Sequence, residues 1–346
     1  MNSSWVTDRG MQMLCREENG TLGCSLIETL SIDHTHVTKR GIETILLALK
    51  SLQILHCQFH ILLPALSKLS ENFAKNGETT TLPLTRIVTV LVRNRREIVQ
   101  IQRAFSICNQ LVVNHLNLEC GRKSSDLTDR DLARILSITH FDLVELSFNG
   151  FPDASFTFVK GIAPLLEVVG GKLQELHICG ANHVDLSLVV THCVHLKKLR
   201  LNYNTSYLDN AIPSKTARLR QLEEFLFTAT EFEDVTHTFP SKNQLAFLFS
   251  SPFLKTLICK CCATLSDSVL ECAFRQSMFE NLKYISLWGC HSITNSGLDC
   301  FLRDENSIAF FHVNKCDLVD VEQFNAEFLL KKKERNWKVN VFNSSI

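Results

Sequence analysis

Apolar residues recur along the chain in a short pattern, L-x-x-L-x-L, which is clearest at Leu282, Ile285 and Leu287. Side chains alternate between the two sides of an extended strand, so Ile285 and Leu287 are predicted to point into a core, and Ser286 and Trp288 away from it. Downstream, Thr294 precedes apolar residues at spacings of three and four, which predicts a threonine N-cap and an amphipathic helix. The stretch therefore predicts a strand, a bend and a helix.

The strand pattern returns throughout the chain at a period of about 28 residues, which is within the range of repeats that hold one strand and one helix. The other copies begin at Ile27, Leu52, Ile87, Val113, Leu143, Leu173, Leu196, Leu222, Leu254 and Ile308. The helix-start half repeats in register, as in Val37-Thr38-x-x-Gly41 and Leu127-Thr128-x-x-Asp131. One unit cannot bury its apolar face alone, so the copies must stack into a solenoid. We predict one α/β domain over residues 1–346, with a parallel sheet and about eleven repeats.

Cys262, Cys290 and Cys316 each follow a strand at the same place. With these cysteines the unit resembles the cysteine-containing leucine-rich repeats of F-box/leucine-rich-repeat proteins, whose pattern runs L-x-x-L-x-L-x-x-C-x-x-I-T-D-x-G-L. The resemblance covers nearly the whole chain and is strongest from Leu254 to Cys316. It implies a horseshoe with the sheet on its concave side and the helices on its convex side. In that family the F-box binds a Skp-type adaptor on a cullin scaffold, while the repeats hold the target for ubiquitin transfer.

Three stretches depart from the pattern. Residues 1–26 hold an incomplete first repeat, and we find no F-box ahead of it. Residues 60–110 are degenerate repeats. Residues 331–346 are predicted to form a C-terminal cap, with a last helix on the charged run 331–335 and a closing strand at 337–341. The basic residues Arg93, Arg95 and Arg96 mark either a solvated helix start or a site for an acidic partner.

The composition narrows the class of partner. With 36 basic and 36 acidic residues, the chain has a formal charge of zero, so no electrostatic attraction to nucleic acid or to an anionic membrane is expected. The chain has no apolar run long enough for a membrane span. Its 13 histidines form neither H-E-x-x-H nor a nucleophile–base set, so we expect no enzyme and no cofactor. The partner is expected to be a protein.

Fourteen cysteines are a high count, but those at repeat positions are predicted to point inward: Cys57, Cys259, Cys262, Cys290 and Cys316. No apolar leader is recognised at the N-terminus, so reduced thiols in the cytoplasm or nucleus are favoured over a disulfide framework. A zinc site at Cys259-x-Cys261-Cys262 is disfavoured, because Cys259 and Cys261 point to opposite sides of the strand. We predict no metal site.

The predicted binding surface lies on the concave face, where side chains alternate with the buried ones. An aromatic group there is typical of an interface anchor, unless a terminal helix or the C-terminal tail covers it. The predicted protein-binding residues are Tyr284, Trp288, Phe310 and His312, with Arg200 and His177 further along the face. Two functions stay open: substrate recognition in an SCF-type ubiquitin ligase, and a stand-alone scaffold or inhibitor without a ligase. A Skp-type adaptor and a cullin are expected only if an F-box is supplied elsewhere.

Overall fold

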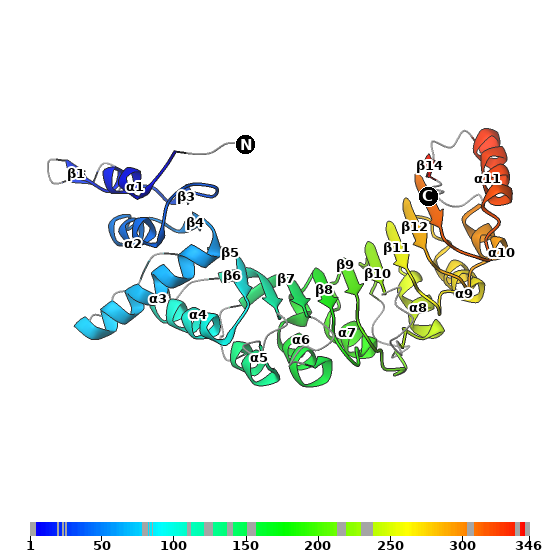
Figure 1. The fold of residues 1–346 in the computed structure, drawn as a ribbon, viewed down its shortest axis with the longest axis horizontal. Helices are drawn as coiled ribbons and strands as arrows, with labels where there is room; N and C mark the ends of the chain where they lie inside the picture. Colours follow the sequence, from blue (N-terminus) through cyan, green and yellow to red (C-terminus); the bar gives the residue numbers. More distant parts are fainter. Residues whose placement is uncertain are drawn as a thin grey trace. The chain divides into compact units, whose positions relative to one another are not determined.

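The computed structural model describes residues 5–18, 21–22, 24, 26–77, 82, 84, 86–108, 112–120, 127–136, 141–150, 157–212, 219–229, 238–302, 308–335 and 340–342. The fold is α/β, with helices that alternate along the chain with the strands of a parallel sheet (Figure 1). Contacts between Cα atoms divide the chain into two compact units, Met1–Glu145 and Leu146–Ile346. The single domain over residues 1–346 stays a prediction.

The first unit contains four strands that pair in parallel and in chain order: β3 (Thr29–Ser31), β4 (Ile54–His56), β5 (Arg86–Val92) and β6 (Val112–Glu119). Its helices are α1 (Asp8–Leu14), α2 (Lys39–Ala48), α3 (Phe59–Asn76), α4 (Arg95–Ile107) and α5 (Asp129–Leu136). The degenerate stretch 60–110 thus forms a helix, a strand and a helix like its neighbours. An antiparallel pair, β1 (Glu17–Glu18) and β2 (Thr21–Leu22), was not predicted by the repeat pattern.

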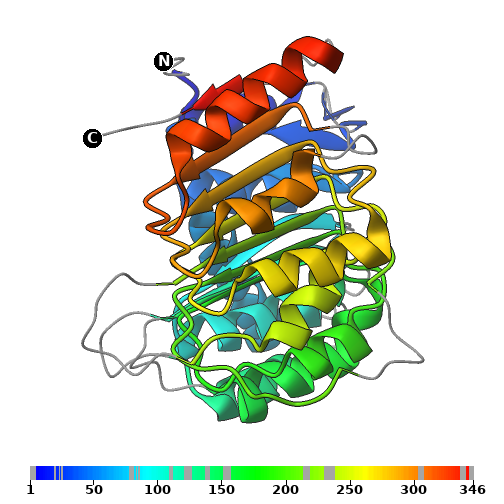
Figure 2. The same ribbon diagram turned by 90° about the vertical axis from the view of Figure 1, so that its right-hand side faces the viewer.

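Strand β7 (Phe141–Asn149) contains the boundary between the units. The second unit has parallel strands in chain order: β8 (Glu175–Cys179), β9 (Lys198–Asn202), β10 (Glu224–Thr228), β11 (Thr256–Lys260), β12 (Tyr284–Trp288), β13 (Phe310–Asn314) and β14 (Asn340–Phe342). Its helices are α6 (Ala163–Val169), α7 (Leu186–His192), α8 (Lys242–Phe249), α9 (Asp267–Ser277), α10 (Asn295–Leu298) and α11 (Val321–Arg335), with short helices η1 (Phe158–Ile162), η2 (Gly170–Lys172) and η3 (Asp299–Leu302). The helices α8 to α11 lie on one face of this sheet (Figure 2), and we call the opposite face the open face.

Strands β8 to β11 and β13 bury alternate side chains, as the sequence pattern predicts. On β12 the outward-facing Ser286 is buried as well, because it lies between Ile258 and His312 on the neighbouring strands. Ile285 and Leu287 on β12 have no exposed surface, and they pair in register with Leu257 and Cys259 on β11. Each core position therefore packs against its equivalents on the neighbouring strands. Trp288, which alternates with these residues, is only half-buried.

Three predicted inward positions in the first unit are less buried than expected. Ile27 and Leu30 are half-buried, because β3 is the last of the described strands in the sheet order and packs against β4. Cys57 is also half-buried rather than buried, since β4 ends at His56 and pairs with β5 only at Ile54. The sequence pattern does not show where a sheet ends or where pairing is short.

The threonine N-caps are joined to the preceding repeat by a carboxylate. Thr294 caps α10, and its backbone N–H and its hydroxyl donate to the two carboxylate oxygens of Asp267, at 2.8 and 2.7 Å. Thr38 at the start of α2 donates in the same way to Asp8, at 2.7 and 2.6 Å. The carboxylate satisfies a donor group at the helix start that the helix itself leaves without a partner.

This contact explains the glycine in the I-T-x-x-G pattern. A Cβ atom on Gly297 would stand 2.9 Å from Asp267 Cα and still closer to the carboxylate. We therefore expect Gly297→Ala to lower the free energy of unfolding by about 1–3 kcal/mol, because one repeat must move away from the next. The matched control is Gly171→Ala, whose new Cβ meets nothing within 4 Å. Equal urea midpoints for the two variants would contradict this close approach.

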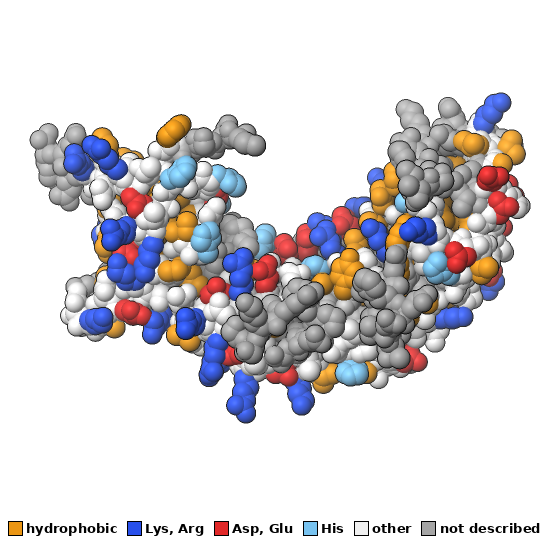
Figure 3. Space-filling view, in the orientation of Figure 1, with side chains coloured by type: hydrophobic (Ala, Val, Ile, Leu, Met, Phe, Trp, Pro, Cys, Tyr) orange, Lys and Arg blue, Asp and Glu red, His pale blue; other side chains and the backbone are white. Residues whose placement is uncertain are grey.

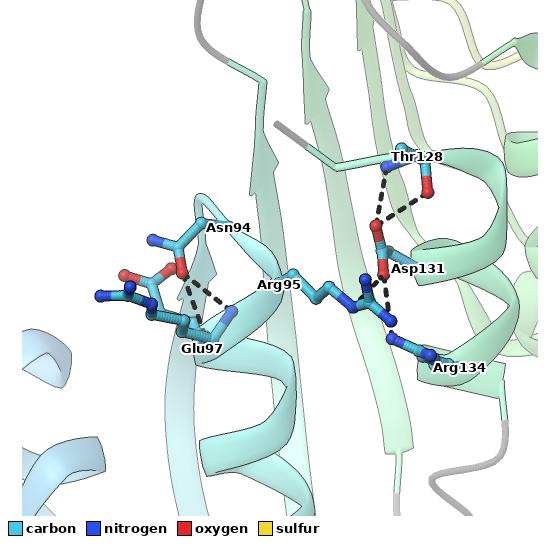
Figure 4. A network of polar contacts seen from close by, with 7 residues as sticks. Asn94, Arg95, Glu97, Thr128, Asp131 and Arg134 are labelled. Atoms are coloured by element: carbon cyan, nitrogen blue, oxygen red, sulfur yellow. Dashed lines mark hydrogen bonds and ion pairs between the residues drawn. The ribbon is translucent and has the colours of Figure 1, made fainter. Parts of the chain in front are cut away.

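At one junction between repeats in the first unit, an arginine occupies the position that Asp8 and Asp267 occupy in their repeats. Here Asp131 stands where Gly41 and Gly297 stand in their repeats, and it accepts from the Thr128 hydroxyl at 2.8 Å. Its carboxylate also lies 3.6 Å from Arg95 Nε, in the preceding repeat, and 3.3 Å from Arg134 (Figure 4). An arginine from one repeat and an aspartate from the next thus replace the aspartate–glycine pair.

This network accounts for part of the basic cluster noted in the sequence. Arg95 pairs with Asp131, and Arg93 lies 3.0 Å from a carboxylate oxygen of Glu119. Asn94 caps α4 by accepting from the backbone N–H of Arg96, as the first of the two interpretations expects. Two of the three arginines are therefore engaged within the chain.

Asp131→Ala is expected to lower the free energy of unfolding by about 1–3 kcal/mol, because Asp131 is only 5% exposed and its removal leaves the Thr128 donors without this acceptor. Arg130→Ala is the control, since Arg130 is exposed on the same helix. Chemical denaturation measures both. A control that loses as much stability as Asp131→Ala would show that the network adds nothing.

The C-terminal helix begins earlier than the sequence analysis predicted. Helix α11 starts at Val321, ten residues before the charged run, because Phe324 and Phe328 lie one helical turn apart and pack on Phe311 of β13. The closing strand is β14, Asn340–Phe342. The predicted strand residues 337–339 lie outside the described part of the chain.

Among the described residues, none of the helices combines the length and the apolar character that crossing a membrane requires.

Candidate functional site

The open face of the second unit is a grid of side chains. Strands β8 to β13 pair without a shift, so equivalent residues form three rows across the strands, with about 4.8 Å between neighbours. The first row, at the amino ends of the strands, is Glu175, Lys198, Glu224, Thr256, Tyr284 and Phe310. The middle row is His177, Arg200, Leu226, Ile258, Ser286 and His312. The last row is Cys179, Asn202, Thr228, Lys260, Trp288 and Asn314.

The β8–β10 part of the grid is polar, and its charges neutralise one another. Lys198 Nζ donates to Glu175 at 2.7 Å, and Arg200 lies 3.8 Å from the carboxylate of Glu224. His177 Nε2 is 3.0 Å from the Asn202 amide nitrogen. Burial lowers the pKa of His177, and the positive charge of Arg200 lowers it further. Acidic and basic side chains lie next to each other over this part of the sheet (Figure 3).

The β11–β13 part is aromatic. Tyr284 and Phe310 are register neighbours and stack with their ring centroids 4.4 Å apart and an angle of 2° between the planes. His312 Nδ1 is 3.2 Å from the Ser286 hydroxyl, and burial together with the charge of Lys260 lowers the pKa of His312. These aromatic side chains are half-buried, because each packs against its neighbours in the row.

The side chain of Lys315 covers part of Trp288, with its ammonium nitrogen 4.7 Å from the ring centroid. Lys315 directly follows β13 and has φ 51°, in the left-handed region, where the chain turns out of the strand. Cys261 and Gly289 follow their strands with φ 55° and 62°, so the turn is a property of the repeat. Alternation of side chains predicts only residues within a strand, so it did not identify Lys315, which follows the strand.

The structure divides the predicted binding residues into two groups. Tyr284, Trp288, Phe310 and His312 lie together on β12 and β13. His177 and Arg200 are neighbours on β8 and β9, and the nearer strand, β9, is three strand spacings or about 14 Å from β12. Between the groups lie Leu226 and Ile258, which are half-buried neighbours on β10 and β11. The rule used for the other strands, applied to β10, would have found Leu226.

The C-terminal strand β14 lies next to the aromatic side chains of β13, so its position decides whether it covers them. Its residues continue the sheet beside β13, with Asn340 opposite Phe310 and Phe342 opposite His312. Residues 340–342 therefore extend the open face at its edge rather than cross it. Residues 343–346 lie outside the described part of the chain.

Four of the five inward-pointing cysteines, Cys259, Cys262, Cys290 and Cys316, are buried in the second unit. Burial raises the pKa of Cys262 to about 11, and that of Cys193 to about 12. In the described part of the chain, no three His, Cys, Asp or Glu side chains are placed to hold a metal ion.

We expect alkylation of the native protein at neutral pH to label Cys272, which is exposed, and to leave Cys193 and Cys259 unmodified until urea is added. The reason is that the thiolate is the reactive form and buried thiols hold their proton. Mass spectrometry of the labelled peptides measures this. Native disulfides, or zinc in stoichiometric amount, would contradict the prediction of reduced, metal-free cysteines.

The register and the alternating burial define the described part of the chain as a repeat-type α/β fold with a parallel sheet. No protein-family model matches the sequence, and no curated protein matches it. Among solved structures, the chain is similar to one in the crystal structure of the Rad7 and Elc1 complex in yeast, with 13% sequence identity over 92% of this chain and 81% of that chain, and a TM-score of 0.37.

Proposed function

We propose that this protein is a non-enzymatic leucine-rich-repeat solenoid, a horseshoe of about eleven repeats, that binds another protein on its concave face. We further propose that it recognises the substrate of an SCF-type ubiquitin ligase in the cytoplasm or nucleus. The observation that carries the proposal is the stacked pair of Tyr284 and Phe310 on the open face, with Trp288 at the other end of the same strand. Clustered aromatic side chains on an accessible surface are typical of protein interfaces.

The aromatic β11–β13 part and the charged β8–β10 part of the open face would contribute differently to the binding of a protein. Aromatic side chains supply most of the binding energy when a partner removes water from them. The ion pairs around Lys198 and Arg200 are partly exposed, so they contribute little stability and serve to select the partner. The link to a ligase is supported by the repeat motif alone, which resembles that of F-box/leucine-rich-repeat proteins.

Affinity purification with mass spectrometry tests both parts of the proposal. The tagged protein should capture at least one protein that the Tyr284→Ala/Trp288→Ala double variant does not capture. A Skp-type adaptor and a cullin in the same eluate would support the ligase role, and their absence beside a captured partner would favour a scaffold or inhibitor. If the double variant captures the same proteins as the wild type, the aromatic group is not the site.

A further inference from the structure

The β11–β13 part of the open face carries positive charge without acidic counterparts in the grid. Its nine grid positions include Lys260 and no carboxylate, and the turn after β13 adds Lys315. Both lysines are exposed. In contrast, each acidic residue of the β8–β10 part contacts a cation of that same part. The charges of the two halves are therefore arranged differently, although the chain as a whole is neutral.

The two lysines flank the same indole ring. Lys260 and Trp288 are register partners on adjacent strands, and Lys315 lies 4.7 Å from the centre of the Trp288 ring. The acidic residue nearest to Lys315 in the sequence is Asp317, and it is 2.9 Å from His291 Nδ1. Burial and the charge of Lys260 lower the pKa of His312, which disfavours a positive charge on this histidine. A carboxylate of a partner would meet two ammonium groups here.

Apolar surface begins directly beside these charges. Ile258 lies two residues before Lys260 on the same strand and on the same face, next to Leu226 on β10. Tyr284 and Phe310 continue the apolar surface along the first row. A ligand that reaches the lysines with a carboxylate can thus place an apolar side chain on the neighbouring rows.

We propose that the partner presents an extended peptide segment in which Asp or Glu stands next to a large apolar residue. The carboxylate binds between Lys260 and Lys315, and the apolar side chain packs against Ile258, Tyr284 and Phe310. This inference rests on the proposed protein-binding function and names the chemistry of the ligand. Nucleic acid is usually bound by several cations that contact its phosphates. On this face Lys198 and Arg200 are already paired with Glu175 and Glu224, which leaves the two lysines beside an apolar surface, an arrangement that favours a peptide.

The test is selection from a displayed library of random linear peptides on the immobilised full chain. We expect the enriched peptides to carry Asp or Glu within two positions of Phe, Trp, Tyr, Leu or Ile. The Lys260→Glu/Lys315→Glu double variant should bind these peptides at least about tenfold more weakly, and binding to the wild type should weaken as salt is added. Selection on the double variant should instead enrich peptides with Lys or Arg.

The control is Lys242→Glu, which makes the same charge change at the exposed start of α8, on the helix side of the sheet. Melting temperatures of all variants show whether they are folded. The proposal is overturned if no peptide is enriched, if the enriched peptides lack acidic residues, if the control weakens binding as much as the double variant, or if a single-stranded oligonucleotide competes for the site. Partner capture that depends on Trp288 but not on the two lysines would leave the proposed function intact and reject this inference alone.

Discussion

Leu257→Asp should unfold the C-terminal repeats at room temperature. Leu257 has no exposed surface, and its register partners are Phe225 on β10 and Ile285 on β12, both equally buried. An unpaired carboxylate at this position costs several kcal/mol, which is comparable to the total of about 5–15 kcal/mol that stabilises a typical domain. The neighbouring repeats should unfold with it, because each repeat completes the core of the next. Circular dichroism melts and urea titration measure the loss.

The matched control is Ile258→Asp, the same change one residue further along the strand. Ile258 is half-buried on the open face, where water reaches the new carboxylate and Lys260 stands two residues away. This variant should keep most of the secondary structure and melt well above Leu257→Asp. If Leu257→Asp melts like the wild type, or if the two variants exchange their behaviour, the assignment of the two faces of β11 is wrong.

Trp288→Ala should weaken binding to the captured partner about thirtyfold, from the roughly 2 kcal/mol that truncation of an interface anchor typically costs. The indole is half-exposed and stands beside Lys260 and Lys315, so a partner can still remove it from water. The melting temperature should change little, because the buried side of the strand is untouched. Isothermal titration or surface plasmon resonance with the purified partner measures the affinity.

Asp299→Ala, on the exposed side of η3, is the control for Trp288→Ala. It should leave both the affinity and the melting temperature near the wild-type values. Equal affinities for the two variants would move the binding site away from the aromatic group. A large drop in the melting temperature of Trp288→Ala would instead show that the indole acts mainly in packing.

The residues of the proposed binding site differ in how far the sequence could predict their positions. Alternation along β12 was enough to predict that Ile285 is buried and that Trp288 faces the other way, since both follow from the geometry of one strand. The stacking of Tyr284 on Phe310 was also within reach, because a parallel sheet with one period brings equivalent residues together. The position of Lys315 over Trp288 was not, since it depends on the left-handed turn after β13.

The sequence by itself determined the repeat: its period, the buried face of each strand, and the threonine that begins α10. These are local properties, set by side-chain alternation and by hydrogen bonds within a few residues. The tertiary structure alone decided the contacts between repeats, such as the hydrogen bonds from Thr294 to the carboxylate of Asp267 and the ion pair between Arg95 and Asp131. Such contacts join residues that are almost a full repeat or more apart in the chain, so they exist only once the strands have paired in register and one helix has packed beside the next.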